Sequence, residues 1–370
     1  MYTNGKMSNW LEIDLKAIEN NVHFLRQYAG VQIMAVVKAN GYGHGAIAIA
    51  RAAILGGATW FGVARVEEAL ELRYAQINQP ALVLGYTPLE KYQQAIEHNI
   101  SLTIWSHEQL EFANQVAQTI RLKAKLHLKV DTGMSRLGIQ VEQAVNLAQQ
   151  IARYPHVDFE GLFTHFAMAD ELDPVPTDQQ EAVFHKLVEH MHALGIHPKV
   201  IHTANSGALL TRPNSYYDLV RPGILIYGLH PSEVCPAPAS IQPALSWKSV
   251  ISHIKMLPPG RGVSYGYEYV TSRAERIGTV PVGYADGYRR NGNNIIIVGG
   301  VRVPVIGRVC MDQVMIQLDQ APNAQEGDEV ILIGQQGNES IRAEEVGTLW
   351  HTNNYDVICG IGQRVPRIYI

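Results

Sequence analysis

The feature that most constrains the fold is a regular alternation of short apolar runs with stretches of helical periodicity along the first two thirds of the chain. Eight runs rich in β-branched and aliphatic residues recur at intervals of roughly 20 to 30 residues, and each is long enough for one buried strand. The runs span residues 31–38, 59–64, 80–85, 101–105, 122–131, 157–166, 199–204 and 217–223. Between them, segments such as 65–75 and 178–195 place apolar residues at i, i+3, i+4 and i+7, as in a helix with one apolar face. The pattern predicts eight consecutive strand–helix units.

Eight such units favour a closed (β/α)8 TIM-type barrel, an α/β fold in which helices surround parallel strands. A doubly wound open sheet is the alternative. Its dinucleotide-binding form carries a G-x-G-x-x-G turn after the first strand, and this turn does not follow residues 31–38. We therefore predict an N-terminal barrel over residues 1–240.

The pattern changes after a proline-rich segment at residues 225–247, which resembles a linker. From about residue 241 onward, short apolar runs alternate with Gly and Asn turns, and only residues 342–351 have helical periodicity. The runs span residues 248–257, 276–283, 294–307, 313–318 and 328–334. Residues 241–370 are therefore predicted to form a C-terminal, mainly antiparallel β domain.

Composition argues against several classes of protein. The formal net charge is -4 and no long cluster of Lys and Arg interrupts the mixture of signs, so nucleic acid is not expected as a partner. The three cysteines, Cys235, Cys310 and Cys359, lack CxxC spacing, and the 15 histidines form no H-E-x-x-H motif, so neither a disulfide framework nor a metal site is expected. The sequence also lacks a signal-peptide pattern and an apolar run of the about 18 residues that cross a bilayer. We expect a cytoplasmic protein with no membrane contact.

Polar residues cluster where the predicted barrel strands end. Active sites in this fold lie at the carboxyl ends of the strands, on the loops that follow. The residues at these positions are Lys38, Lys129, Asp131, His165, Asn205, Ser206 and Arg221. Any one of them alone is ordinarily a solvated strand end, but several on the same rim indicate a functional site.

Lys38 is the most informative of these residues. It ends the apolar run "IMAVVK", where partial desolvation would lower its pKa and make it a nucleophile able to form a Schiff base with a carbonyl group. The alternative is a lysine that only reaches solvent. The segments 205–207 and 221–224 follow the last two strands with a hydroxyl and Gly-exposed N–H groups, the usual phosphate position in barrels. Tyr42 would add a phenol, and together these features point to pyridoxal phosphate or a carbonyl substrate.

Several longer motifs resemble one enzyme family along nearly the whole chain. In the barrel they are "AVVKANGYGHG", "KVDTGMSRLG", "THFA", "HTANSG" and "VRPGI", and in the β domain "VSYGYEY", "VPVGYADGY", "GRVCMDQ" and "RVPR". With these motifs the sequence resembles the bacterial alanine racemases, which are pyridoxal-phosphate-dependent isomerases of the barrel type (fold III). The resemblance implies a cytoplasmic enzyme that supplies D-alanine for peptidoglycan.

The resemblance also implies roles for individual residues. Lys38 would hold pyridoxal 5'-phosphate and act as one catalytic base, with Tyr265 as the other. Cofactor contacts are implied for Lys38, Tyr42, His165, Asn205, Ser206, Arg221, Gly223, Ile224 and Tyr355. Arg136 and Met311 would bind the alanine carboxylate. Lys129 would be carbamylated, because a carbamate turns repulsion between two cations, Lys129 and Arg136, into an ion pair.

The chemistry of racemisation agrees with two bases. Inverting a Cα centre requires proton removal from one face and delivery to the other, and Lys38 and Tyr265 would serve the two faces. Arg221 stays protonated, so it would leave the cofactor's ring nitrogen unprotonated and weaken the ring as an electron sink. Because Tyr265 and Lys38 lie in different domains, some domain or subunit arrangement must bring them together. The resemblance implies a head-to-tail homodimer with shared active sites.

Other functions remain as alternatives at this point. A barrel-type decarboxylase dependent on pyridoxal phosphate would share the barrel, the β domain and the lysine, and Cys310 would then act in catalysis instead of serving as a buried core residue. Such enzymes pair the ring nitrogen with a carboxylate, unlike Arg221. A non-enzymatic cofactor carrier would lack the β domain. A racemase of broader specificity, acting on serine, is a third alternative, but the bulk of Tyr355 favours alanine.

Overall fold

The computed structural model describes residues 7–291 and 293–370, which fold into two compact units. One unit spans Lys16–Gln242, and the other joins Pro243–Ile370 to the segment that ends at Leu15. Strand β1 (Asn9–Ile13) therefore lies in the second unit, although it falls within the range 1–240 that the sequence analysis assigned to the barrel. The reason is long-range pairing: β1 runs antiparallel to β11 (Leu245–Val250) and parallel to β21 (Arg367–Tyr369).

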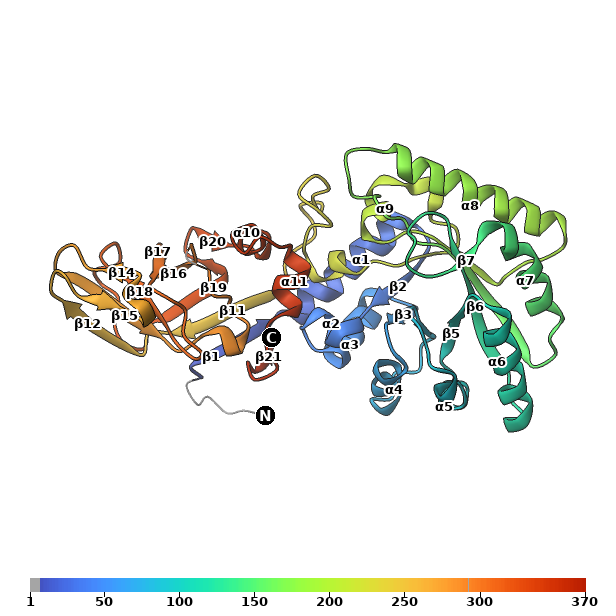
Figure 1. Cartoon of the computed structure of the whole chain (residues 1–370), viewed down its shortest axis with the longest axis horizontal. Helices are drawn as coiled ribbons and strands as arrows, with labels where there is room; N and C mark the ends of the chain where they lie inside the picture. The colour runs from blue at the N-terminus through green and yellow to red at the C-terminus, as the bar shows by residue number, and fades with distance from the viewer. Residues whose placement is uncertain (1–6, 292) are drawn as a thin grey trace. The chain divides into compact units, whose positions relative to one another are not determined.

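The first unit is a nearly closed barrel of eight parallel strands (Figure 1). Its strands are β2 (Gln32–Val36), β3 (Trp60–Val63), β4 (Ala81–Val83), β5 (Ser101–Ile104), β6 (Ala124–Asp131), β8 (Val157–Phe163), β9 (Val200–His202) and β10 (Leu219–Val220). The order is β10-β2-β3-β4-β5-β6-β8-β9, and the short β7 (Ile139–Gln140) pairs with β6. Backbone bonds from Asp218 N to Ile201 O and from Arg221 N to Ala204 O join the two ends. Each strand coincides with one of the eight apolar runs, so the predicted α/β barrel is confirmed.

Helices follow the strands and cover the outside of the barrel (Figure 1). They are α1 (Leu15–Ala29), α3 (Ala46–Gly56), α4 (Val66–Tyr74), α5 (Tyr92–Glu97), α6 (His107–Ile120), α7 (Val141–Arg153), α8 (Val175–Ala193) and α9 (Ser206–Thr211). The short segment α2 (Lys38–Tyr42) is instead a left-handed turn at the end of β2. The strands are buried on both sides, as expected for parallel strands wrapped by helices. Inside the barrel, Met34, Trp60, Leu82, Val200 and Leu219 form one packed cluster from five strands. The barrel interior is therefore a core that holds the strand ends in fixed positions.

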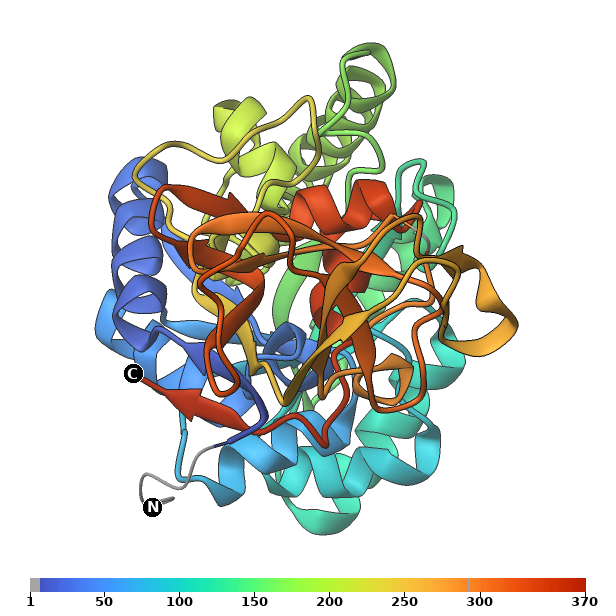
Figure 2. The ribbon, with the colours of Figure 1, turned by 90° about the vertical axis from the view of Figure 1, so that its left-hand side faces the viewer.

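The second unit is a mostly antiparallel sheet, and its strands can be followed in orange and red in Figure 2. Besides β1, β11 and β21 it contains β12 (His253–Leu257), β15 (Glu275–Val280), β16 (Ile295–Val298), β17 (Val301–Ile306), β18 (Val314–Gln317), β19 (Glu329–Gln336) and β20 (Glu339–Ile341). A separate pair, β13 (Gly262–Val263) and β14 (Tyr269–Val270), flanks the short helix η4 (Tyr265–Tyr267). Helices α10 (Ala343–Leu349) and α11 (Asn354–Cys359) complete the unit. In β11 buried and half-buried residues alternate, which is the pattern expected of a strand with one face in the core and one face near solvent.

Within the two described ranges, no helix combines the length and the apolar character needed to cross a membrane.

Candidate active site

The barrel gathers the predicted polar residues on one rim. Lys38 follows β2, Lys129 and Asp131 end β6, and His165 follows β8 by two residues. Ser206 begins α9 after β9, and Arg221 follows β10. All of these strands are parallel members of one sheet, so their carboxyl ends open on the same side.

Lys38 opens a strained turn at the end of β2. Ala39, Asn40, Gly41 and Tyr42 all have φ between 50° and 60°, which makes a left-handed helical turn. This conformation costs about 1–2 kcal/mol for each residue that has a Cβ. Hydrogen bonds hold the turn in place, among them Gly41 N to Val37 O at 2.8 Å and Gly45 N to Asn40 O at 2.8 Å. Such strain is characteristic of functional segments, because ordinary connections relax out of it.

A carboxylate outside the predicted set anchors this turn. Glu68, in the first turn of α4, accepts a hydrogen bond from Ala39 N at 2.7 Å with one oxygen. Its other oxygen accepts from Ala64 N at 2.7 Å and from Arg65 N at 3.2 Å. Glu68 therefore ties the residue after Lys38 to the start of α4. The sequence carried no signal for this contact, because a glutamate in the first turn of a helix is ordinarily a cap.

A small polar corner forms where β10, α9 and the turn after Lys38 meet. The hydroxyl of Ser206 accepts a hydrogen bond from Gly223 N at 2.9 Å. Tyr42 is buried and stacks on Tyr227 with ring centroids 4.8 Å apart. A Cβ added to Gly223 would lie 2.5 Å from the Tyr42 hydroxyl oxygen, so only glycine leaves this corner open. Two hydroxyls and the backbone N–H of a glycine are groups that suit a phosphate.

The other residues predicted at this corner support its backbone. Asn205 is the N-cap of α9, and its Oδ1 accepts a hydrogen bond from Ala208 N at 3.0 Å. Ile224 is buried and starts the short helix that follows Gly223. Both residues hold the chain segments that carry Ser206 and Gly223.

Arg221 is buried deep in the rim, where its hydrogen bonds fix its orientation. Its Nη2 donates to Thr164 O at 2.9 Å and to Thr203 O at 2.8 Å, and lies 3.3 Å from His165 Nδ1. Its Nη1 lies 2.9 Å from His202 Nδ1. Burial lowers the pKa of Arg221 to about 9, which still leaves the guanidinium charged at neutral pH.

Burial and charge in this pocket lower the pKa values of two neighbours of Arg221. Lys129 is buried with its ammonium nitrogen 4.5 Å from the centre of the Phe163 ring. Burial and then the charges of Arg221 and Arg136 hold the pKa of Lys129 well below its usual range. Burial and then the charge of Arg221 also lower the pKa of His165 well below its usual value. At neutral pH the rim therefore offers an uncharged imidazole, and a lysine whose pKa is lowered, beside a guanidinium.

Arg136 lies on the exposed loop after β6. Asp131 shapes that loop, because its Oδ1 accepts hydrogen bonds from Gly133 N and Ser135 N, both at 3.0 Å. A Cβ on Gly138 would lie 2.6 Å from Asp131 N, so the loop also depends on a glycine. Asp131 is therefore a loop anchor rather than a group that faces the pocket.

The remaining predicted residues lie in the β unit. Tyr265 and Met311 line the same hollow of about 970 Å³ and are 70% and 53% exposed. Ser264 precedes Tyr265 with φ 65°, a strained value for a residue with a Cβ, and its hydroxyl donates to Arg308 O at 2.6 Å. Tyr355 is half-buried in α11. An exposed tyrosine and methionine held by a strained turn are suited to meet another surface.

Cys310 differs from its expectation as a buried core residue. It is half-buried in the hollow that Tyr265 lines, with its Sγ 3.5 Å from the Ser264 hydroxyl. Its position is set by close contacts between turns and not by packing in the core. Gly283 lies against the backbone of Cys310 and Met311, and Gly307 lies against Ser264, the residue whose hydroxyl contacts Cys310.

Comparison with known proteins agrees with this arrangement over the whole chain. Residues 13–231 match the family model of the alanine racemase N-terminal domain, and residues 244–369 match that of the alanine racemase C-terminal domain. An alanine racemase of Symbiobacterium thermophilum is 41% identical over 372 residues, covering 100% of this chain and 99% of its own. An alanine racemase of Desulfovibrio desulfuricans is 40% identical and covers 98% of both chains.

Solved structures show the same likeness in three dimensions. Alanine racemase of Clostridium difficile 630 superposes with a TM-score of 0.94 at 36% identity, covering 98% of this chain and 96% of its own. Alanine racemase of Bacillus anthracis with bound L-Ala-P superposes with a TM-score of 0.93 at 39% identity, covering 100% and 96%. On both its barrel and its β unit, this chain belongs to the alanine racemase family.

Proposed function

We propose that this chain interconverts L-alanine and D-alanine with pyridoxal 5'-phosphate held on the barrel rim by Lys38. The observation that carries the proposal is the rim itself, where the Lys38 turn, the open corner at Gly223 and the buried Arg221 occur in a member of the alanine racemase family. A lysine amine, a polar corner and a buried cation on one rim suit the aldehyde, the phosphate and the ring nitrogen of this cofactor.

The residues of the barrel would hold the cofactor at three points. Ser206, the N–H of Gly223 and the Tyr42 phenol suit its phosphate, and Tyr355 would join them from the β unit. Once bound, the cofactor supplies an electron sink that acidifies the Cα–H of the amino acid joined to it. Arg221 can only donate hydrogen bonds, so it would leave the ring nitrogen without a proton. A weaker sink favours prompt return of a proton to Cα over side reactions.

Two bases on opposite faces would move the proton. Lys38 would act on one face and Tyr265 on the other. His165 supports this role for Tyr265, because its Nδ1 faces a guanidinium that can only donate. The proton of the neutral imidazole then lies on Nε2, where it can donate to the Tyr265 oxygen and stabilise its deprotonated form.

A homodimer would complete the site. Tyr265 and Met311 are exposed on the β unit, and we propose that they reach the barrel of a second copy in a head-to-tail dimer with shared active sites. Two observations support this assembly: the exposed side chains of Tyr265 and Met311 would be buried in such an interface, and the strained turn at Ser264 would hold Tyr265 in position for it. Equilibrium sedimentation of the purified protein tests it, and a monomer at catalytic concentrations would exclude it.

Arg136 and Lys129 would prepare the site for an amino-acid carboxylate. Arg136, with Met311, would bind that carboxylate. A lowered pKa makes the neutral amine of Lys129, the form that adds to carbon dioxide, easier to reach, and its carbamate would place a negative charge between Arg136 and Arg221. The bulk of Tyr355 near the substrate side chain favours alanine over serine. The product would be D-alanine for peptidoglycan. We propose a reducing cytoplasm as its location, because Cys235, Cys310 and Cys359 form no disulfide in the part of the chain that the structure describes.

The decisive experiment follows the substrate proton and the cofactor in one sample. The purified protein is expected to show the absorbance band of lysine-bound cofactor, and in D2O both enantiomers of alanine should exchange the Cα hydrogen and invert. Lys38→Ala should lose the band and the exchange. Release of carbon dioxide, or a band without inversion, would overturn the proposal in favour of a decarboxylase or a cofactor carrier.

A further inference from the structure

A row of buried polar side chains runs through the barrel interior from Arg221 to Glu160. Arg221 Nη1 lies 2.9 Å from Nδ1 of His202, and Nε2 of His202 lies 3.0 Å from Nδ1 of His127. Nε2 of His127 lies 3.1 Å from Oε2 of Glu160. All four side chains are buried. The row therefore joins the rim to a carboxylate on β8, at a position that no part of the proposed reaction uses.

Hydrogen-bond chemistry sets one direction along this row. A guanidinium only donates, so Nδ1 of His202 must accept and its single proton must lie on Nε2. That proton is donated to Nδ1 of His127, whose own proton must then lie on Nε2 and point to Glu160. Burial and then the charge of Arg221 lower the pKa of His202 well below its usual value, which agrees with a neutral ring.

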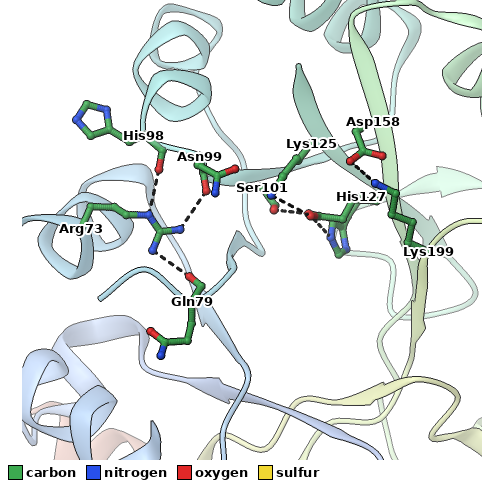
Figure 3. A network of polar contacts seen from close by, with 10 residues as sticks. Arg73, Gln79, His98, Asn99, Ser101, Lys125, His127, Asp158 and Lys199 are labelled. Carbon is green, nitrogen blue, oxygen red and sulfur yellow. Dashed lines mark hydrogen bonds and ion pairs between the residues drawn. The ribbon is translucent and has the colours of Figure 1, made fainter. Parts of the chain in front are cut away.

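Glu160 ends the row as an anion. Burial raises the pKa of Glu160, whereas hydrogen bonds from His127 and Ser101 and the nearby Lys125 ammonium stabilise its ionised form. Ser101 donates to the carboxylate, and the Lys125 ammonium lies 3.7 Å from its other oxygen. Figure 3 shows Ser101, Lys125 and His127 around this end of the row. An ionised carboxylate can only accept, so both ends of the row impose the same direction.

The backbone is shaped to admit this row. In the pairing of β6 with β8, Leu126 faces Phe159 while His127 faces Gly161, so Glu160 is an extra residue at a β-bulge. A Cβ on Gly161 would lie 2.1 Å from His127 Nδ1, which no real contact permits. Phe163 stacks on His202 with centroids 4.7 Å apart. A bulge, a glycine and a stacked ring together hold the two imidazoles in line.

We propose that Glu160 is a second counter-charge of Arg221, in addition to the Lys129 carbamate, acting across the barrel through His127 and His202 as positioning residues. The hydrogen-bond partners of Arg221 within the described chain are two carbonyl oxygens and two imidazoles, none of which is charged. A buried cation so placed is costly unless its charge is balanced. Aligned hydrogen bonds polarise one another, so the Glu160 charge is felt at the guanidinium. The inference rests on the proposed function, because it concerns how firmly Arg221 is held beside the cofactor ring.

The variant Glu160→Gln tests the charge while keeping the shape of the side chain. Its amide oxygen retains an acceptor for His127 but removes the anion, while Arg221 still fixes the direction of the hydrogen bonds from the other end. We expect a changed absorbance spectrum of the bound cofactor and a fall in kcat of at least about tenfold, the lower end of the effect of a lost charged hydrogen bond. The KM for alanine should stay within about twofold, since Glu160 is remote from Arg136. The matched control is Asp158→Asn on the same strand, whose ion pair with Lys199 at 2.5 Å is visible in Figure 3; it should match the wild type.

A second measurement needs no variant and no activity. Nitrogen-15 NMR of the imidazoles in the wild-type protein without cofactor should find His127 and His202 neutral at pH 7, with the proton on Nε2 in both rings. A charged ring, or a proton on Nδ1 of either ring, would overturn the proposal, as would Glu160→Gln behaving like Asp158→Asn. If the wild-type protein neither binds the cofactor nor racemises alanine, the proposed function is refuted. The NMR result then still tests the direction of the hydrogen bonds between Arg221 and Glu160.

Discussion

Replacing Glu68 with glutamine should show how much the Lys38 turn depends on one carboxylate. The turn holds Ala39, Asn40 and Tyr42 in left-handed conformation, at a cost of about 3–6 kcal/mol in total if each residue contributes ~1–2 kcal/mol. Glu68 offsets part of that cost with its bond to Ala39 N and also caps α4. Glutamine keeps one acceptor oxygen and replaces the other with a donor, so one of the two sets of N–H groups loses its partner.

The magnitude follows from the number and exposure of the bonds that are lost. A hydrogen bond to a charged group contributes about 1.5–3 kcal/mol, and the half-buried position of Glu68 places the loss near the lower end, at about 1–2 kcal/mol. If glutamine leaves Ala39 unpaired, the turn can relax and Lys38 departs from its position. We expect kcat to fall by roughly five- to thirty-fold, the range to which these energies correspond.

The assay combines urea unfolding, the absorbance of lysine-bound cofactor and the rate of alanine racemisation. The neighbouring Glu67→Gln is the matched control, because Glu67 is exposed and forms its ion pair with Lys91, at 3.3 Å, and not with the Lys38 turn. That control should keep wild-type stability within about 0.5 kcal/mol and wild-type activity. Equal behaviour of Glu68→Gln and Glu67→Gln in all three measurements would refute the reasoning.

Three further predictions test other parts of the site. Gly223→Ala places a Cβ 2.5 Å from the Tyr42 hydroxyl oxygen, so the affinity for the cofactor should fall by about 1–3 kcal/mol. Titration of the cofactor-free protein with pyridoxal phosphate measures this affinity. An unchanged affinity would show that the cofactor does not use this corner. His165 and His202 have pKa values held well below 6.5, so below that pH the unfolded chain binds more protons than the folded chain. The free energy of unfolding should therefore fall with decreasing pH, by up to about 1.4 kcal/mol per pH unit for each group. Urea midpoints at several pH values measure this dependence, and His165→Asn should flatten its slope. Tyr265→Phe removes the hydroxyl of a side chain that is exposed in the single chain, so the free energy of unfolding should change by less than about 0.5 kcal/mol. The rate of Cα hydrogen exchange should fall more for one enantiomer of alanine than for the other. An equal fall for both enantiomers would contradict two separate bases.

The sequence by itself determined most of the architecture and the position of the rim. Each of the eight apolar runs became a barrel strand because burial on both faces requires continuous apolar residues, and this requirement is visible locally. The rule that barrel sites lie at the carboxyl ends of strands then selects Lys38, Lys129 and Arg221 from the sequence alone. The family resemblance extended the set to Tyr265 and Met311, whose motifs alone carried the signal, since an exposed tyrosine has no distinctive pattern.

Only the tertiary structure decided which distant groups meet. The pairing of β1 with β11 and β21, the bond from Ala39 to Glu68 and the bulge at Glu160 join residues that are far apart in sequence or change register by one position. Periodicity reports the environment of a residue and not its partner, so these contacts leave no local trace. The same holds for the row from Arg221 to Glu160, because the directions of its hydrogen bonds are set jointly by both ends. The sequence therefore predicts which types of residue lie on the rim. The protonation and orientation of these side chains depend on contacts that form only when the barrel closes.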